Sequence, residues 1–317
     1  MSSLVTRLAP SPTGAMHLGN ARTFMLTAWW AYSDGATSLL RIEDLDHPRK
    51  KPHSIESIRE DLQWMGVNWD FETPIQSTRH ASHLRALEAL RSKGDVYVCK
   101  CTRQDVIDAQ SAPHESLLDL VYPGTCRAAT WDPRSHESNE GKALALRFRV
   151  PATPVSFDDR VFGPQTVDLA RQSGDFVVGR IRADGEVEVG YQLAVVTDDA
   201  EDGVTHVLRG ADLLLSAARQ RAIQTALDLP TVTYAHFPLV VGTDGRRLAK
   251  RHGDTRLASL RDDGMTAERL WRWVASTISM PAATQAEVLS RQLNLSNIPR
   301  DPVVLTGRDL AWLCGRE

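Results

Sequence analysis

Hydrophobic and polar positions along the chain form short apolar runs separated by amphipathic stretches, the pattern of strands that alternate with helices. An apolar run at Leu4–Leu8 predicts a first strand, and residues 18–30 predict a helix after a loop rich in proline and glycine. Ser38–Ile42 predicts a second strand, and residues 54–66 and 79–93 predict amphipathic helices. This order is typical of the opening of a parallel α/β sheet.

The pattern changes near residue 95. Short alternating stretches at 143–150, 154–159, 176–180 and 186–189 predict a small β-rich unit. Its position in the middle of the chain indicates an insertion between two α/β halves.

The α/β pattern resumes with an apolar run from Tyr191 to Val196, which predicts a strand running into Asp198 and Asp199. A strand at 204–209, a helix at 216–227 and a strand at 234–241 follow, and the tail from residue 256 is expected to be helical.

Composition narrows the class of protein. The 317 residues are 42% hydrophobic and 24% charged, no run approaches the roughly 20 apolar residues of a membrane span, and the N-terminus lacks a secretory signal pattern. We therefore expect a cytoplasmic protein without a membrane or DNA partner. Because the net charge is −3, any RNA contact should be a local basic patch, as at residues 246–251.

The loop before the first helix carries the first candidate site. Free N–H groups and the positive end of the dipole at a helix N-terminus bind phosphate. His17 is placed to donate to that phosphate, and Gly19 leaves room for a nucleotide against the backbone. The loop is neither a P-loop nor a G-x-G-x-x-G motif, because neither glycine pattern is present.

Three of the four cysteines, Cys99, Cys101 and Cys126, lie close together in the sequence, whereas Cys314 is expected not to be a ligand. In a reducing compartment such a cluster indicates a metal before a disulfide. Tetrahedral zinc needs a fourth ligand, which the spacing leaves open. The candidates by chemistry are His114, Asp119 and His136.

Other histidines and tryptophans are given structural roles. His83 is expected on the polar surface of its helix, and His206 and His236 are expected as core or edge histidines of apolar strands. Trp271 and Trp273 could stack on bases, but packing of the tail onto the core is the favoured use.

Two segments carry a resemblance to a known family. His17-Leu18-Gly19-Asn20 resembles the first signature of class I aminoacyl-tRNA synthetases, and the preceding Pro-Ser-Pro-Thr-Gly is similar to the glutamate-specific branch. Arg247-Leu248-Ala249-Lys250-Arg251 resembles the second signature, with Lys250 in the position of its second lysine. Arg247, Ala249 and Arg251 depart from the consensus, and the loss of a hydroxyl at Ala249 is expected to affect the rate.

The resemblance implies a set of substrate-binding residues. ATP, accompanied by Mg²⁺, is expected to contact His17, Gly19, Asn20 and Lys250, of which His17 and Lys250 would be catalytic because they stabilise phosphate charge. Glutamate is expected to contact the residues from Arg7 to Ser11 (Arg7, Leu8, Ala9, Pro10, Ser11), together with Glu43, Tyr191 and Arg209. The segments 40–44, 191–199 and 204–212 carry this part of the resemblance.

The short relatives with a cysteine-bearing insertion are the glutamyl-Q tRNA(Asp) synthetases, which the chain resembles. The resemblance points to Tyr122 as the fourth ligand of a structural Zn²⁺, beside Cys99, Cys101 and Cys126. It implies an α/β fold: a class I synthetase-type Rossmann domain with a parallel sheet, an inserted zinc-bearing α/β subdomain and a short helical C-terminal tail.

The domain boundaries expected from this resemblance follow the changes in pattern. Residues 1–95 and 191–255 would form the two halves of the Rossmann domain, the second containing the Lys250 loop, and 96–190 the insert. Residues 256–317 would be a truncated helical region without an anticodon-binding domain.

The resemblance also implies the reaction. The expected enzyme is a ligase that activates L-glutamate as glutamyl adenylate and transfers it to queuosine at the first anticodon position of tRNA(Asp), so that the anticodon stem-loop is its partner. The 67 residues after Lys250 are too few for the anticodon-binding domains of a glutamyl-tRNA synthetase. A truncated synthetase that charges a tRNA 3′ end, a non-catalytic paralogue that binds glutamate or tRNA, and an unrelated nucleotidyltransferase remain alternatives.

Overall fold

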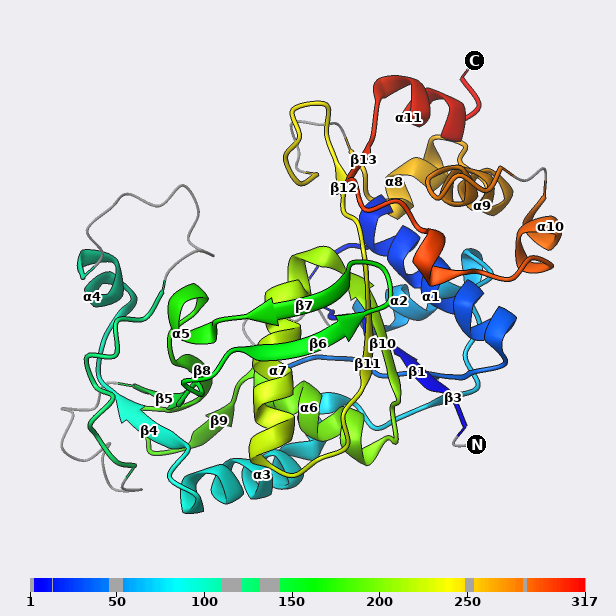
Figure 1. Ribbon diagram of the computed structural model, residues 1–317. Helices are drawn as coiled ribbons and strands as arrows, with labels where there is room; N and C mark the ends of the chain where they lie inside the picture. The colour runs from blue at the N-terminus through cyan, green and yellow to red at the C-terminus, as the bar shows by residue number, and fades with distance from the viewer. Residues whose placement is uncertain are drawn as a thin grey trace.

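The computed structural model in Figure 1 describes residues 3–12, 14–45, 54–109, 121–131, 143–248, 254–281 and 284–316. Its centre is a parallel sheet. β1 (Val5–Leu8) pairs in parallel with β2 (Thr37–Leu40), and β2 pairs in parallel with the short β3 (Phe71–Glu72). The first strand, the first helix and the second strand of the sequence prediction are confirmed.

The second half of the sheet continues from β1. β10 (His206–Gly210) lies beside β1, where the Thr205 N–H donates to the Val5 carbonyl at 2.9 Å. β10 then pairs in parallel with β11 (Thr233–Phe237), β11 pairs with β6 (Val155–Asp159), and β7 (Gly163–Val167) runs antiparallel to β6. Strands from the two ends of the chain thus meet at the β1–β10 junction.

Helices cover both faces of this sheet, because its strands carry apolar side chains on both faces. Leu40 and Leu208 belong to one hydrophobic core, which is shared with α1 (Leu18–Asp34) and α2 (Ser54–Trp64). Their strand neighbours Leu39 and Val207 point the other way, into a second core. The helices of that second core are α3 (His80–Ser92), α6 (Tyr191–Glu201) and α7 (Leu214–Ala226).

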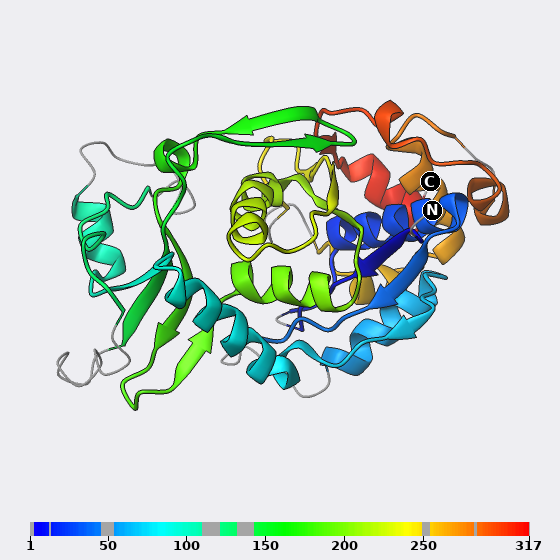
Figure 2. The ribbon, with the colours of Figure 1, turned by 60° about the horizontal axis from the view of Figure 1, so that its bottom comes forward.

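The inserted unit contains an antiparallel sheet of four strands in the order β4-β5-β8-β9. Their bounds are β4 Val96–Cys99, β5 Leu144–Phe148, β8 Phe176–Ile181 and β9 Val187–Val189. A capping box at Thr102 begins the short α4 (Arg103–Asp108), and α5 (Leu169–Gln172) precedes β8. Figure 2 shows this unit at one end of the molecule and the C-terminal helices at the other.

The C-terminal region packs on α1 and α2. Its elements are α8 Leu257–Asp262, α9 Ala267–Ser276, α10 Gln285–Leu289, β13 Val303–Val304 and α11 Gly307–Leu313, and β13 pairs in parallel with β12 (Val240–Val241). Short 3₁₀ turns occur at Gln76–Arg79, Ala211–Leu213 and Leu295–Asn297. Trp271 and Trp273 are buried in this packing, so the predicted structural role of both is confirmed.

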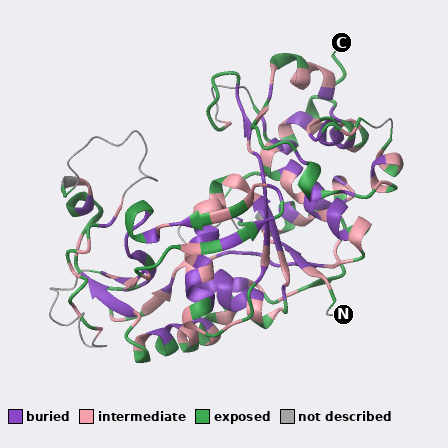
Figure 3. Cartoon of the chain, in the orientation of Figure 1, coloured by how far each residue is buried: buried purple, intermediate pink, exposed green. Residues whose placement is uncertain are grey.

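Several sequence predictions were wrong. The apolar run 191–196, predicted as a strand, is the first half of helix α6, which is buried along most of its length (Figure 3). The predicted strand 234–241 is two strands, because Pro238 has no N–H to continue the ladder. β7 was not predicted, and its Gly-Pro start and alternate exposed positions explain why.

His83 was predicted on the surface and is instead buried. Its Nε2 lies 2.8 Å from Asp198 Oδ1 in α6, and the Gln76 amide donates to the other oxygen of Asp198 at 2.7 Å. His236 is a core histidine, as predicted. None of the described helices has the length and apolarity needed to span a lipid bilayer.

We expect the C-terminal region to contribute to stability through Trp271. Its ring is fully buried, and its Nε1 donates to the Met65 carbonyl at 2.7 Å. Trp271→Phe should lower the free energy of unfolding by about 1–3 kcal/mol, because a buried carbonyl loses its donor and a cavity forms. Urea denaturation measures this, with Trp312→Phe as the control at a half-buried tryptophan. Equal stability of the two variants would contradict the expectation.

Candidate active site

The β1–β10 junction places the two halves of the candidate site together. A cavity lies beyond the carboxyl ends of these strands, where open α/β sheets bind ligands. Its lining includes six residues of interest from both halves of the chain: Ala9, His17, Gly19, Asn20, Arg209 and Arg247. Both signature segments and two predicted glutamate residues, Ala9 and Arg209, therefore line one cavity.

The first signature forms the start of α1. His17 is the N-cap residue in extended conformation, and its side chain does not cap the helix, so the imidazole is available to a ligand. Partial burial lowers the pKa of His17, the Asp254 carboxylate opposes this, and the Arg247 charge lowers the pKa further. A Cβ added to Gly19 would only touch Val240, at 3.8 Å, so the protein itself does not require glycine there.

The second signature is described up to Leu248. Arg247 lines the cavity and forms an ion pair with Asp212 at 2.8 Å. On the far side of the loop, the Thr255 carbonyl accepts from the Leu18 N–H at 2.9 Å, and the Met16 carbonyl accepts from Leu257 at 2.8 Å. Both flanks of the loop thus lie at the start of α1. Ala249, Lys250 and Arg251 lie outside the described residues.

A buried cluster of charges lies on the other side of the β1–β10 junction. Asp199 of α6 accepts from Arg41 Nη2 at 2.6 Å and from Arg7 Nε at 3.3 Å. Burial alone would raise the pKa of Asp199, but the Arg41 and Arg7 charges outweigh it and the pKa is lowered. Burial raises the pKa of Glu43, and the charges of Arg41 and Arg7 only partly oppose it.

Arg209 and Tyr191 join this group of charges. Loss of solvent raises the pKa of the Tyr191 hydroxyl, Glu43 and Asp199 raise it as well, and Arg209 and Arg7 lower it. The side chains of Glu43, Asp199, Arg7 and Arg209 thus all lie close enough to affect the pKa of that hydroxyl, although part of the tyrosine faces solvent. Arg209 Nη1 is buried and has no hydrogen-bond partner among the described residues. A donor of this kind can bind a carboxylate.

The remaining predicted glutamate residues contribute backbone. Leu8 is fully buried and its side chain belongs to the core, so only its backbone can meet a ligand. The Pro10 carbonyl accepts from the Glu43 N–H at 3.0 Å, which holds the loop after β1 against the end of β2. Ser11 follows Pro10 at an exposed position of the same loop.

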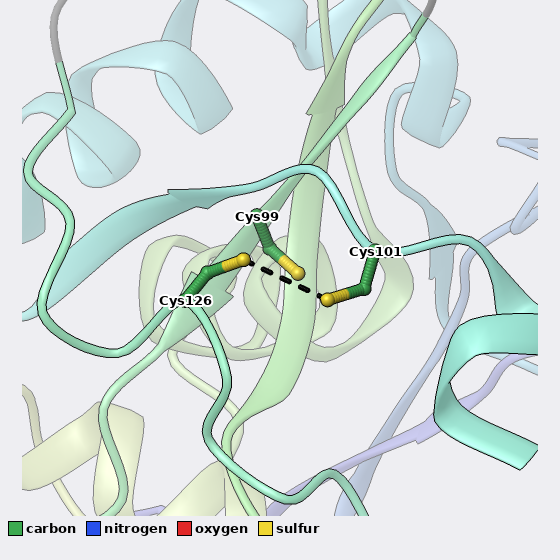
Figure 4. A group of neighbouring side chains, drawn as sticks. All are labelled: Cys99, Cys101 and Cys126. Atoms are coloured by element: carbon green, nitrogen blue, oxygen red, sulfur yellow. Dashed lines mark hydrogen bonds between the residues drawn. The ribbon is translucent and has the colours of Figure 1, made fainter. Parts of the chain in front are cut away.

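The structure brings together the three predicted cysteine ligands (Figure 4). The sulfurs of Cys99, Cys101 and Cys126 all lie within 4.8 Å of one another, and Cys101 Sγ and Cys126 Sγ are 3.6 Å apart. In a tetrahedral site with Zn–S bonds of about 2.3 Å, sulfurs are roughly 3.8 Å apart. The cluster therefore has the dimensions of a zinc site.

The Tyr122 hydroxyl lies beside this cluster. It lies 3.3 Å from Cys99 Sγ and 3.8 Å from Cys101 Sγ. Gly174 allows the Tyr122 backbone to approach closely, because any Cβ at this position would collide with it. His114, Asp119 and His136 lie outside the described residues, and Cys314 is buried in the C-terminal region.

Sequence reasoning missed the residues that hold the site together. Asp199 was noted only as the end of an apolar run, although a carboxylate after such a run is a signal of a buried ion pair. The pairing of His236 with Asp159, at 2.6 Å between Nδ1 and Oδ2, had no signal, because 77 residues separate the two.

Comparisons with known proteins agree with this geometry. The family model described as "tRNA synthetases class I (E and Q), catalytic domain" matches residues 3–298. A glutamyl-Q tRNA(Asp) synthetase of Rhodopirellula baltica is 46% identical over 93% of this chain and 91% of its own length. One of Symbiobacterium thermophilum is 41% identical over 98% and 99%.

A solved structure shows the same fold. The glutamate-tRNA synthetase of Elizabethkingia anophelis superimposes with a TM-score of 0.80 at 25% identity, over 98% of this chain and 70% of that protein. The α/β fold with its parallel sheet is therefore that of class I synthetases. The family model and the sequence relatives show that the chain belongs to the class I tRNA synthetases, in the group of glutamyl-Q tRNA(Asp) synthetases, and that it is a ligase.

Proposed function

We propose that the chain activates L-glutamate with ATP and transfers the glutamyl group to queuosine at the first anticodon position of tRNA(Asp). The observation that carries the activation step is the single cavity at the β1–β10 junction. It joins a helix N-terminus suited to phosphate with the arginine Arg209, suited to a carboxylate. Class I synthetases use ATP with Mg²⁺, which fits the phosphate side of this cavity.

In the first step, a carboxylate oxygen of glutamate attacks the α-phosphorus of ATP. A new P–O bond forms, the bond to the bridging oxygen breaks, and pyrophosphate leaves with Mg²⁺. His17 and Lys250 stabilise the phosphate charge, and the N–H groups at the start of α1 bind the nucleotide beside Gly19 and Asn20. No side chain acts as a nucleophile, so alignment of the two substrates dominates catalysis.

The proposed role of Lys250 is supported by the positions of the residues on either side of its loop. Arg247 and Leu248 line the cavity, and Thr255 is hydrogen-bonded to the start of α1. The chain that carries Lys250 therefore leaves and re-enters the described structure beside His17. A lysine in such a loop can follow the charge that develops on the leaving pyrophosphate.

Glutamate would bind where the cavity adjoins the buried cluster of charges, with Arg209 common to both. Its ammonium group would restore the charge of Glu43, whose pKa is raised by burial. Arg7 and Arg209 supply positive charge for its carboxylates, and the Tyr191 hydroxyl lies within reach of the same charges. Ala9 lines the cavity, and Leu8, Pro10 and Ser11 form the adjoining backbone.

In the second step, a hydroxyl of the acceptor attacks the acyl carbon and AMP leaves. The proposal of queuosine as acceptor is supported by the two relatives named glutamyl-Q tRNA(Asp) synthetase, which match over 91% and 99% of their lengths. The similarity to a glutamate-tRNA synthetase structure keeps transfer to a tRNA 3′ end as the second candidate. Both would use the same activation cavity.

We further propose that Cys99, Cys101, Tyr122 and Cys126 hold a structural Zn²⁺. Four donors converge there: Cys99 ends β4, Cys101 follows it, and Tyr122 and Cys126 lie in the segment that begins at Tyr122. Such an ion would tie the ends of this segment to the inserted sheet. We propose residues 96–190 as the zinc-bearing subdomain, between Rossmann halves at 1–95 and 191–255 and the C-terminal region 256–317. The prediction that 154–159 belongs to the small β-rich unit was wrong, because β6 pairs with β11 and, with β7, extends the main sheet.

The acceptor can be tested directly with labelled glutamate. With ATP present, the protein should label tRNA(Asp) that contains queuosine and leave tRNA(Asp) without queuosine unlabelled. Labelling should persist when the 3′-terminal adenosine has been removed, because the acceptor is then in the anticodon. The measurement is acid-precipitable radioactivity on each tRNA.

The same experiment separates the alternatives. If labelling does not depend on queuosine and is lost with the terminal adenosine, the protein charges the tRNA 3′ end and the queuosine proposal is wrong. Absence of any glutamate-dependent exchange of pyrophosphate into ATP would identify a non-catalytic paralogue. Exchange with another acid in place of glutamate would identify a different nucleotidyltransferase.

A second prediction concerns Gly19. Because a Cβ there meets no close protein atom, Gly19→Ala should leave stability unchanged or raise it by about 0.5–1 kcal/mol, as in other helices. The methyl group would occupy the nucleotide's space, so the KM for ATP should rise at least about tenfold. Gly307→Ala at the start of α11 is the matched control, since its Cβ also meets open space. An unchanged KM for ATP in Gly19→Ala would contradict the role of Gly19.

A third prediction concerns zinc. The purified protein should contain about one Zn²⁺ per chain, as a Cys₃Tyr site requires. Cys126→Ser should lose the metal and lower the melting temperature, whereas Cys314→Ser should retain it, because Cys314 lies in the C-terminal region. Metal content is measured by plasma mass spectrometry. Equal metal content in these two variants would rule out the site.

A further inference from the structure

Three side chains from neighbouring strands form a hydrogen-bonded series that ends at Arg209. Arg209 Nε donates to His236 Nε2 at 3.0 Å, and His236 Nδ1 lies 2.6 Å from Asp159 Oδ2. Arg209 is on β10, His236 is opposite it on β11, and Asp159 ends β6. All three are buried, with 5%, 0% and 3% of their surfaces exposed.

The direction of each hydrogen bond follows from chemistry. A guanidinium N–H can only donate, so His236 Nε2 must carry the lone pair. The proton of the neutral imidazole is then on Nδ1, and it is donated to Asp159. Burial lowers the pKa of His236 to about 4, even though the hydrogen bond to Asp159 raises it, so the ring is neutral near pH 7.

Asp159 is itself fixed in orientation. Its Oδ1 accepts from the N–H groups of Val161 at 3.0 Å and Phe162 at 2.9 Å, which leaves Oδ2 for His236. The ring of Tyr234 packs against both Arg209 and His236. Asp159, His236 and Tyr234, which contribute to the orientation of Arg209, are not among the residues that line the cavity.

We propose that Asp159 and His236 are positioning residues that select the glutamate substrate by holding Arg209 in place to bind a carboxylate. The proposal rests on the proposed function of Arg209. Held by His236 through Nε and by the Leu213 carbonyl through Nη2 at 3.3 Å, the guanidinium keeps Nη1 for the substrate. A flexible arginine would lose conformational entropy each time it bound a substrate molecule, which would weaken binding.

Asp159→Asn tests the direction of the hydrogen bonds. The amide oxygen would stay with the backbone N–H groups of Val161, Phe162 and His236, which now donate to Oδ1 of Asp159, and the amide nitrogen would donate to His236 Nδ1. That reverses the tautomer and turns an N–H of His236 toward the N–H of Arg209, two donors facing one another. The KM for glutamate in pyrophosphate exchange should rise at least about tenfold, as it does when a group that orients a ligand-binding residue is lost.

Two substitutions of His236 separate positioning from stability. In His236→Asn the amide nitrogen lies near the position of Nδ1, so it keeps the bond to Asp159 and loses the acceptor for Arg209. In His236→Gln the amide lies near the position of Nε2, so its oxygen can accept from Arg209. We expect His236→Asn to keep the higher melting temperature but to have the higher KM for glutamate.

The control is His206→Asn, at the opposite end of β10 and hydrogen-bonded to Thr205. It should leave the KM for glutamate unchanged. In all variants the KM for ATP should stay within about twofold, because the residues named at the ATP side are untouched. Discrimination between glutamate and glutamine should fall in Asp159→Asn and His236→Asn.

The outcomes distinguish this inference from the function on which it rests. If the unmodified protein shows no glutamate-dependent exchange, the proposed function fails. If it shows exchange, but the His236 variant with the lower melting temperature is also the one with the higher KM for glutamate, then the residues are structural and the inference is overturned. If Asp159→Asn does not fold, the His236 pair still decides.

Discussion

The two halves of the sheet are held together by a buried carboxylate, Asp199, between two arginines. Arg7 comes from β1, Arg41 follows β2, and Asp199 comes from α6, nearly 160 residues later in the chain. Buried charges are costly unless they are paired, and removal of one partner of such a pair costs about 3–5 kcal/mol. Each half therefore supplies charges that it could not bury alone.

The same cluster determines the charge of the proposed glutamate pocket. Glu43 is paired with Arg41 at 3.1 Å, but burial still raises its pKa, so an ammonium group nearby would favour its charged form. Arg209 contributes a positive charge on the neighbouring strand. Of the charged groups in this cluster, Glu43, Arg7 and Arg209 are the ones that we propose to contact glutamate, which carries one ammonium and two carboxylates. In this proposal, stability and substrate choice depend on one set of ions.

Local sequence patterns predicted the helices and strands of this fold better than they predicted the contacts between distant parts of the chain. The helices and strands near the two signatures follow from hydrophobic period and turn residues, and the cysteine cluster follows from spacing. The run 191–196 was mistaken for a strand, because a short apolar run looks alike in a buried strand and in a helix buried on most sides. The burial of His83 and the link from His236 to Asp159 depend on contacts across 115 and 77 residues, which no local pattern records.

Arg209 Nη1, which has no hydrogen-bond partner in the part of the chain that the structure describes, connects this architecture to selectivity. A buried donor without an acceptor costs about 1–3 kcal/mol, and a carboxylate that binds it recovers that cost with a charge-assisted hydrogen bond. A neutral amide recovers less, because it offers one acceptor and brings its own N–H donors. The protein can maintain such a strained donor only where the arginine cannot turn to another partner. Asp159 and His236, two strands deep in the sheet, supply that constraint.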